Sequence, residues 1–188
     1  MNSSKVSLRK KYILKRMKIA QKKKINFNFN LIFSLIKKHF KNKIIIAGYY
    51  PANYEVNVLK FLKEATRRKL KVALPVISSS KSMSYKLWSC KEPLSVSKFG
   101  ILEPNKSNAQ VTPNLILVPL VAFDKSLNRI GYGKGYYDRS LKKIYKSKKN
   151  VISLGIAYSF QKCKRIPANK NDFKLDYIFT ERGIITSN

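Results

Sequence analysis

The chain has 188 residues, of which 44% are hydrophobic and 12% aromatic, and this composition excludes a disordered or low-complexity protein. Forty lysines and arginines against nine aspartates and glutamates give a formal net charge of +31, a field that attracts polyanions until salt screens it. One histidine and two cysteines without a CxxC spacing exclude a zinc cluster and a disulfide framework, and they argue against a Ser-His-Asp triad.

The predicted elements alternate between strands and amphipathic helices along most of the chain. In chain order, we expect helices at 4–24 and 27–41, a strand at 43–50, a helix at 56–68, strands at 71–76, 84–88 and 115–120, a helix at 136–146, and strands at 151–157 and 177–180. Pro119 is placed at the end of its strand, where proline is tolerated. His39 is interpreted as a solvated helix residue. This order predicts an α/β protein, a mostly parallel sheet covered on both faces.

The basic excess has two interpretations. A nucleic-acid-binding protein would show it. Coding bias would show it too, because Lys, Asn, Ile, Phe and Tyr are all plentiful. We favour bias, since the basic residues are spread along the whole chain, and we expect no specific nucleic-acid partner.

No apolar run is long enough to span a membrane, so no membrane association is expected. The first 54 residues contain no Asp or Glu, a composition that mimics an organellar transit peptide. The same segment is needed to complete a domain of this length. We therefore expect one domain over 1–188, cytoplasmic, uncleaved and monomeric.

The most informative segment is 118–139, VPLVAFDKSLNRIGYGKGYYDR, in which a strand leads into a glycine-rich loop and then a helix. Glycines let backbone N–H groups approach an anion, and the helix N-terminus favours negative charge. Lys134 supplies a mobile ammonium and Arg129 a guanidinium fork for phosphate oxygens. Asp138 is a candidate magnesium ligand. Because ligands of such sheets lie outside the carboxyl ends of the strands, we predict that this loop binds phosphate.

Residue spacing alone leaves alternatives open. The G-x-G-x-G pattern is neither a Walker A loop nor a dinucleotide-binding fingerprint, and a glycine-rich turn can be purely structural. Asp138 can simply complement the helix macrodipole.

The segment resembles the signature PxxAFDxxxxRxGYGxGYYDR of the 5-formyltetrahydrofolate cyclo-ligase family. Four further blocks match in the family's order: SKVSLRK, YYPANYEVN, SMSYKLW with FGILEP, and LGIAYSFQ with NDFKLDYIFTERG. The match spans nearly the whole chain. Seven of the nine acidic residues fall in these blocks, namely Glu55, Glu103, Asp124, Asp138, Asp172, Asp176 and Glu181. The sequence departs from the family pattern at Asn57, where Asp is usual, and at Asn171, where His is frequent.

The resemblance implies a fold and a reaction. The fold is a three-layer α/β/α sandwich of the NagB/RpiA/CoA-transferase-like type. The reaction uses ATP and Mg²⁺ to convert 5-formyltetrahydrofolate into 5,10-methenyltetrahydrofolate, with release of ADP and phosphate. The formyl oxygen is phosphorylated and N10 then closes the ring, so no enzyme nucleophile is required. A paralogue that keeps the ATP site but acts on another substrate is the remaining alternative within the family.

The resemblance also implies roles for individual residues. Catalysis falls to Lys134 and Arg129, and Asp138 and Asp172 hold magnesium. The ATP-binding residues are Lys5, Arg9, Arg129, Gly131, Tyr132, Gly133, Lys134, Gly135, Tyr136 and Tyr137. The folate-binding residues are Tyr50, Glu55, Met83, Tyr136 and Tyr137. Without the resemblance, Lys5 and Arg9 would read as a solvated basic helix face, and Met83 would be as consistent with a core position.

Overall fold

The computed structural model describes residues 4–22, 24–42, 44–78, 82–97 and 100–187. Its helices are α1 (Lys5–Lys22), α2 (Asn30–His39), α3 (Leu59–Arg67) and α4 (Tyr136–Ser147), with a short 3₁₀ turn at Ser159–Gln161. The longer strands are β1 (Ile45–Ala47), β2 (Lys71–Ile77), β3 (Met83–Leu87), β7 (Leu115–Pro119), β10 (Ile152–Ile156), β11 (Tyr177–Thr180) and β12 (Gly183–Thr186). The two-residue strands are β4 (Ser95–Val96), β5 (Leu102–Glu103), β6 (Gln110–Val111), β8 (Ala122–Phe123) and β9 (Arg129–Ile130).

The main sheet has eight strands in the order β12-β11-β10-β7-β1-β2-β3-β6. The five strands from β11 to β2 run parallel, whereas β12, β3 and β6 add antiparallel edges. The expectation of a mostly parallel sheet is therefore confirmed. Pro119 ends β7, as expected, at a position where its missing N–H removes no bond from the middle of the strand.

The strand order reverses between β1 and β7, which are neighbours at the centre of the sheet. From β1 the chain continues to β2 on one side, and from β7 it continues to β10 on the other. Such a reversal opens a crevice outside the carboxyl ends of the two strands, because their connections leave in opposite directions. The topology therefore selects the edge of the sheet where a ligand can enter.

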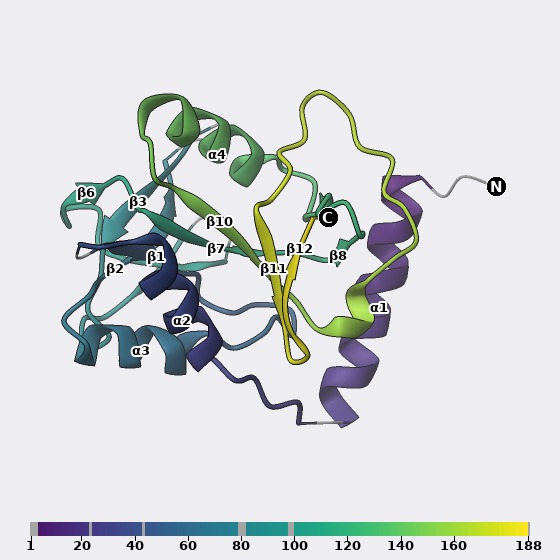
Figure 1. Cartoon of the computed structure of the whole chain (residues 1–188), viewed down its shortest axis with the longest axis horizontal. Coiled ribbons are helices and arrows are strands. Elements are labelled where there is room, and N and C mark those ends of the chain that lie inside the picture. Colours follow the sequence, from purple (N-terminus) through teal and green to yellow (C-terminus); the bar gives the residue numbers. More distant parts are fainter. Residues whose placement is uncertain (1–3, 23, 43, 79–81, 98–99, 188) are drawn as a thin grey trace.

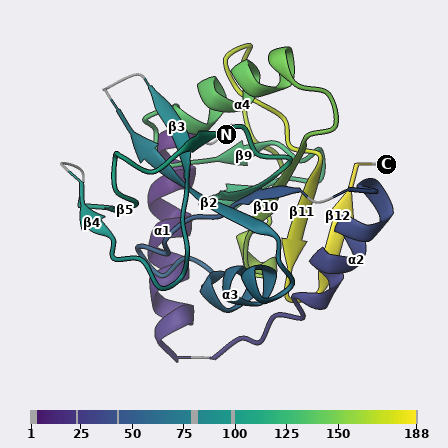
Figure 2. The ribbon, with the colours of Figure 1, turned by 90° about the vertical axis from the view of Figure 1, so that its left-hand side faces the viewer.

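Helices cover both faces of the sheet, so the expected three layers are present. Figures 1 and 2 show α4 on one face and α2 with α3 on the other. Ile32, Phe61 and Leu62 anchor the α2–α3 layer to one face, and Leu141 with Ile144 anchors α4 to the other. These residues are buried, and burial of each apolar side chain contributes roughly 1.5–3 kcal/mol.

Helix α1 lies beside the three layers and packs on the β8–β9 hairpin. Its buried residues Leu8 and Tyr12 contact the cluster that holds Ala122 and Ile130. The same hairpin carries the glycine-rich loop from β9 into α4. Packing against α1 therefore fixes the position of that loop.

Several boundaries differ from those expected. Helix α2 begins at Asn30 and not at 27, because the Asn28 side chain accepts a hydrogen bond from the Asn30 N–H (3.2 Å). Helix α3 begins at Leu59 and not at 56, because Asn57 accepts from the Leu59 N–H in the same way (3.0 Å). Residues 23 and 43, which fall in an expected helix and strand, lie outside the described residues.

The sequence analysis missed six strands. Five of them have two residues each, which is too short to show a periodic pattern. The prediction that 177–180 is the last strand is wrong, since β12 pairs antiparallel with β11 beyond it. The prediction that the glycine loop directly follows the strand at 115–120 also needs correction, because the β8–β9 hairpin intervenes.

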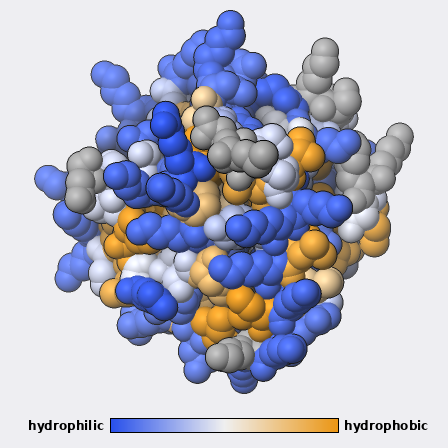
Figure 3. Space-filling model, turned by 90° about the vertical axis from the view of Figure 1, so that its right-hand side faces the viewer, coloured by the Kyte–Doolittle hydropathy of each residue, from blue (hydrophilic) through white to orange (hydrophobic). Residues whose placement is uncertain are grey.

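Figure 3 shows the side of the molecule where α1 lies, and on this face hydrophilic side chains surround smaller hydrophobic patches. His39 is exposed, as expected, and its Nε2 lies 3.0 Å from the Tyr177 hydroxyl. No helix within the described ranges has the length and apolarity needed to cross a membrane.

Candidate functional site

A cavity of about 840 Å³ opens at the carboxyl ends of the central strands. Tyr49 and Tyr50 follow β1, Ile77 ends β2, and Pro119 ends β7, and all four line the cavity. Every residue that the sequence analysis assigned to ATP, folate or magnesium lines it as well. The structure thus brings together side chains from residue 5 to residue 172 in one pocket.

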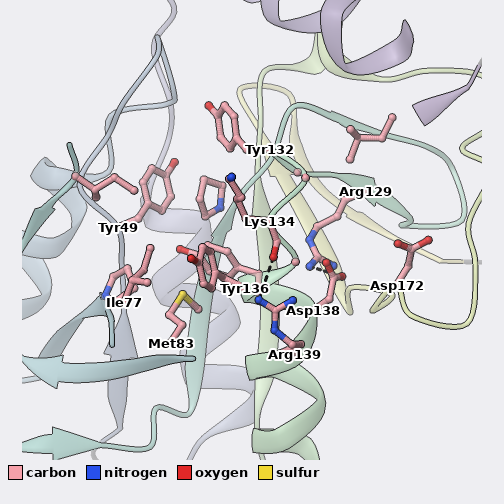
Figure 4. Close-up of a pocket in the computed structure, with 18 of the residues that line it drawn as sticks. Tyr49, Ile77, Met83, Arg129, Tyr132, Lys134, Tyr136, Asp138, Arg139 and Asp172 are labelled. Atoms are coloured by element: carbon pink, nitrogen blue, oxygen red, sulfur yellow. Dashed lines mark hydrogen bonds and ion pairs between the residues drawn. The ribbon is translucent and has the colours of Figure 1, made fainter. Parts of the chain in front are cut away.

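The pocket has two unlike walls, which Figure 4 shows on opposite sides of Lys134 and Tyr136. We call Lys5, Arg129, Asp138 and Asp172 the charged wall, and Tyr49, Tyr50, Ile77 and Met83 the apolar wall. The glycine loop, residues 131–135, lies between them. One wall thus suits an anion with a metal ion, and the other suits a flat ring.

Arg129 and Asp138 form the inner ion pair of the charged wall. The Arg129 side chain is only 4% exposed, and its Nη2 lies 2.7 Å from Asp138 Oδ1. Its Nη1 donates to the Phe173 carbonyl, while the Phe173 N–H donates to Asp138 Oδ1 (3.0 Å). Strand β9 supplies the arginine and the first turn of α4 supplies the aspartate. The pair therefore joins the hairpin, the helix and the 169–173 loop.

Lys5 and Asp172 form the outer ion pair, between the start of α1 and a loop near the C-terminus. The Asn169 N–H also donates to Asp172 Oδ2 (2.7 Å). Burial by itself raises the pKa of Asp172, but the hydrogen bonds from Lys5 and Asn169 outweigh it, so the pKa lies below its ordinary value. Asp172 is consequently ionised at neutral pH.

The two aspartates fit a magnesium ion that is shared with a phosphate. Asp138 uses Oδ1 in its bonds to Arg129 and Phe173, and Asp172 uses Oδ2 in its bonds to Lys5 and Asn169, so each has a second oxygen outside these bonds. The described part of the chain contains no group of three or more His, Cys, Asp or Glu placed to hold a metal. Magnesium in nucleotide sites commonly takes one or two carboxylates, with phosphate and water completing its octahedron.

One arginine from α1 and one from α4 hold the backbone of the glycine loop in place. Arg9 Nε donates to the Gly131 carbonyl (2.7 Å), and the Arg9 guanidinium carbon lies 3.4 Å from where a Cβ on Gly133 would be. Gly133 has φ +96° and Gly135 has φ +68°, a left-handed region that costs other residues free energy. Arg139 Nη2 donates to the Lys134 carbonyl (3.0 Å).

Lys134 is exposed at the top of this loop. In Figure 4 its side chain extends into the pocket, towards Tyr49 and Tyr132 and away from Arg139. The backbone of the loop is therefore fixed while the ammonium group is free to reach a ligand between the two walls.

Two of the tyrosines that line the pocket, Tyr49 and Tyr137, remain neutral. Tyr49 is buried, and its hydroxyl donates to the Val56 carbonyl (2.8 Å). Burial raises the pKa of Tyr49 and of Tyr137 well above the ordinary value. Uncharged rings with half-buried Met83 beside them offer flat apolar contact to a fused heterocycle.

Glu55 lies on the loop that follows β1, close in sequence to Tyr49 and Tyr50 of the apolar wall. A tight turn with left-handed residues, Asn53 (φ 48°) and Tyr54 (φ 61°), directs it into the pocket. The Ala52 N–H donates to Glu55 Oε2 (3.0 Å). Burial raises the pKa of Glu55, whereas the Ala52 N–H, Arg16 and the Tyr132 hydroxyl lower it.

Arg16 is the main residue that the sequence analysis missed. It is 1% exposed, and its guanidinium donates to the Tyr132 hydroxyl through Nη2 and to the Leu120 carbonyl through Nη1 (3.1 Å). A signal was present: Leu8, Tyr12 and Arg16 are four residues apart, so a charged residue occupies the buried stripe of α1.

Glu103 was assigned to a matching block but given no role. It is 5% exposed, lines the pocket and accepts a hydrogen bond from the Ile77 N–H (3.1 Å). It therefore fixes the end of β2 at the apolar wall.

Comparison with known proteins gives consistent results. The model of the 5-formyltetrahydrofolate cyclo-ligase family matches residues 1–181. The chain is 32% identical to the 5-formyltetrahydrofolate cyclo-ligase of Mycoplasma genitalium over 184 residues, 92% of this chain and 94% of the relative. It is also 35% identical to a protein of Schizosaccharomyces pombe described as a probable 5-formyltetrahydrofolate cyclo-ligase, over 54% of this chain and 56% of that protein.

Structural similarity extends over nearly the whole chain. The solution structure of Aquifex aeolicus 5,10-methenyltetrahydrofolate synthetase superposes with a TM-score of 0.78 at 30% identity, covering 98% of this chain and 93% of that one. The fold, the family model and the full-length similarity to the Mycoplasma genitalium protein agree. The chain belongs to the 5-formyltetrahydrofolate cyclo-ligase family, whose members use ATP.

Proposed function

We propose that the pocket binds ATP on its charged wall and 5-formyltetrahydrofolate on its apolar wall and converts the folate into 5,10-methenyltetrahydrofolate, ADP and phosphate. The observation that carries the proposal is the placement of Lys134 between the two walls on a fixed glycine loop. A cation at that point lies where a phosphoryl group would pass from one ligand to the other.

The reaction needs alignment more than it needs an enzyme nucleophile. The formyl oxygen attacks the γ-phosphorus and ADP leaves, after which N10 attacks the activated carbon, loses its proton and expels phosphate. Phosphoryl transfer of this kind depends on positioning and on neutralising the charge that develops. Among the described residues that line the pocket there is no His or Cys, which is consistent with such a route.

Lys5 of the charged wall, together with Arg9 and the N–H groups of the glycine loop, would hold the triphosphate. Gly135 is the N-cap of α4, so the first N–H groups of the helix and the positive end of its dipole lie at the end of the glycine loop. Lys134 would approach the γ-phosphate, and Arg129 would steady the wall from its buried position. Lys5 and Arg129 would exchange part of their contact with the aspartates for contact with phosphate oxygens.

Asp138 and Asp172 would hold Mg²⁺ through the oxygens left outside their ion pairs. The bound ion would neutralise phosphate charge and orient the β- and γ-phosphates. The aspartates would in turn keep the ion on the charged wall, away from the folate.

Tyr50 and Met83 of the apolar wall, together with Tyr136 and Tyr137 at the start of α4, would contact the pterin ring. Glu55 would accept hydrogen bonds from ring N–H groups, an interaction that a carboxylate makes strongly. This contact would set the direction in which the formyl group points.

The test is an absorbance assay for methenyltetrahydrofolate with purified protein, ATP, Mg²⁺ and 5-formyltetrahydrofolate. We expect product only when all four are present, and ADP formation that depends on the folate. Absence of product, or ATP hydrolysis at the same rate without folate, would refute the proposal. ATP turnover with another carbonyl compound, and none with 5-formyltetrahydrofolate, would indicate the paralogue alternative.

A further inference from the structure

A buried arginine, a tyrosine and a glutamate from three separate segments meet at the edge of the pocket. Arg16 is two turns beyond Arg9 on α1, Tyr132 is in the glycine loop, and Glu55 follows β1. Tyr132 and Glu55 line the pocket, and Arg16 lies behind Tyr132. None of these three belongs to the ion pairs of the charged wall.

The guanidinium group of Arg16 carries a positive charge in the protein interior. Its residue is 1% exposed, and no carboxylate in the described ranges forms an ion pair with it. Its Nη2 donates to the Tyr132 hydroxyl and its Nη1 to the Leu120 carbonyl, while its Nε is buried without a partner among the described residues. Burying a charge costs much free energy unless other groups compensate it, so a compensating negative group is expected nearby.

Glu55 is that group, reached through Tyr132. The Tyr132 hydroxyl accepts a hydrogen bond from Arg16. It also lies beside Glu55 in the pocket lining, where Tyr132 and the charge of Arg16 both lower the pKa of the Glu55 carboxyl. The Arg16 guanidinium carbon also lies 5.7 Å from the Tyr132 ring centroid, so ring and charge are in contact. A phenol that accepts a hydrogen bond from a cation is polarised, and this makes its own O–H a stronger donor towards a carboxylate beside it.

We propose that Arg16, Tyr132 and Glu55 form a positioning relay that holds the Glu55 carboxylate in place for the folate and ties that place to the glycine loop. The relay rests on the proposed function, because it concerns the ligand of Glu55. Arg16 and Tyr132 are positioning residues here: they act on the folate through Glu55. Since α1 also carries Lys5 and Arg9, one helix aligns the two halves of the pocket.

The relay also affects the charge of Glu55. The groups that face it are Arg16 from α1, Tyr132 from the loop, Tyr49 after β1 and Tyr137 on α4, together with the Ala52 N–H. Burial raises its pKa, and Ala52, Arg16 and Tyr132 lower it. Removal of the Tyr132 hydroxyl would therefore raise the pKa of Glu55 further. As the pH is lowered, the variant would lose folate binding at a higher pH than the wild-type protein does.

The experiment is Tyr132→Phe, which removes one hydroxyl and keeps the ring and the loop. We expect the KM for 5-formyltetrahydrofolate to rise roughly tenfold, the size of one lost hydrogen bond to a charged group, while the KM for ATP changes by less than about twofold. Direct calorimetric titration of the folate without ATP should show the same loss of affinity. The acid limb of the pH profile of kcat/KM for folate should move to higher pH.

Tyr54→Phe is the matched control. The Tyr54 hydroxyl also bonds to α1, accepting from Gln21 Nε2 (2.8 Å), but Tyr54 lies outside the pocket lining. Tyr54→Phe should leave both KM values unchanged.

A double-mutant cycle makes the result decisive. If Tyr132 acts through Glu55, Tyr132→Phe should add almost nothing to the folate KM of Glu55→Gln. Full additivity, or an unchanged folate KM in Tyr132→Phe, would overturn the relay. A wild-type protein that makes no methenyl product would refute the proposed function instead, whereas the calorimetric titration would still test the relay through folate affinity alone.

Discussion

Different interactions hold the side chains of the two pocket walls in place. On the charged wall, Arg129 with Asp138 and Lys5 with Asp172 are paired ions that neutralise each other. On the apolar wall, Tyr49 is held by packing and by one hydroxyl bond, and burial keeps it uncharged. A wall of paired ions can exchange partners when phosphate and metal arrive, whereas a packed ring presents a fixed surface. The contrast indicates a mobile polyanion on one side and a rigid heterocycle on the other.

The largest expected effect concerns Lys134, where the walls meet. Lys134→Ala should lower turnover by roughly 10²–10³, as for other single contacts that stabilise transition-state charge, and should raise the KM for ATP by much less. Steady-state kinetics at saturating folate measure both constants. Lys125→Ala, an exposed lysine of the β8–β9 turn, is the control. Near-normal turnover in Lys134→Ala would mean that the loop binds phosphate only through its backbone.

The next effect concerns the carboxylates of the charged wall. Asp138→Asn and Asp172→Asn should each raise the Mg²⁺ concentration for half-maximal rate by roughly tenfold to a hundredfold, as changes near a metal commonly do. Magnesium titrations of the rate, and calorimetry of ATP binding at several Mg²⁺ concentrations, measure it. Glu64→Gln on α3 is a control for loss of a paired acid elsewhere. Unchanged titrations in both variants would remove the aspartates from the metal site.

How much of this could be predicted from the sequence depends on how local the signal is. The long amphipathic helices and the buried strands were predicted within a few residues, and the glycine-rich segment marked the pocket. The bonds that build the pocket were not predictable, because they join distant positions: Lys5 meets Asp172, and Arg16 meets Tyr132. Tertiary packing decides such pairs, and no periodic pattern encodes them.

The scarce acidic residues show the same limit. Asp124 accepts from the Ser126, Asn128 and Ile166 N–H groups, and Glu181 accepts from Ser159. Their position in matching blocks gave no means to separate such backbone-fixing acids from those that line the pocket. The role of each acidic residue depends on which distant segment of the chain packs against it in the fold.

A smaller effect would separate the walls by substrate. Met83→Ala should raise the KM for folate by roughly three- to tenfold through lost apolar contact and leave the KM for ATP unchanged. Lys5→Ala should do the reverse, mainly raising the KM for ATP. Both constants are read from one set of initial-rate measurements. If either variant changed both KM values equally, the division into two walls would be wrong.

The smallest effect is on stability. The folded-state pKa of Asp172 lies below the ordinary 3.8, so its ion pair stabilises the fold above that pH and is lost as pH falls through the lowered pKa. Lys5→Met should therefore lower the free energy of unfolding by about 1 kcal/mol or less at neutral pH, and by less still below pH 3.8. Urea unfolding at both pH values measures it, and a difference that grows in acid would contradict the assignment.

The central claim is that the two walls bring the folate formyl oxygen to the γ-phosphate of ATP beside Lys134. It can be tested with 5-formyltetrahydrofolate that carries ¹⁸O in the formyl group. Mass analysis of the phosphate released during conversion to the methenyl product follows the label. The account predicts that each phosphate carries the formyl ¹⁸O, because that oxygen leaves bonded to phosphorus. Unlabelled phosphate, formed while the methenyl product accumulates, would contradict it.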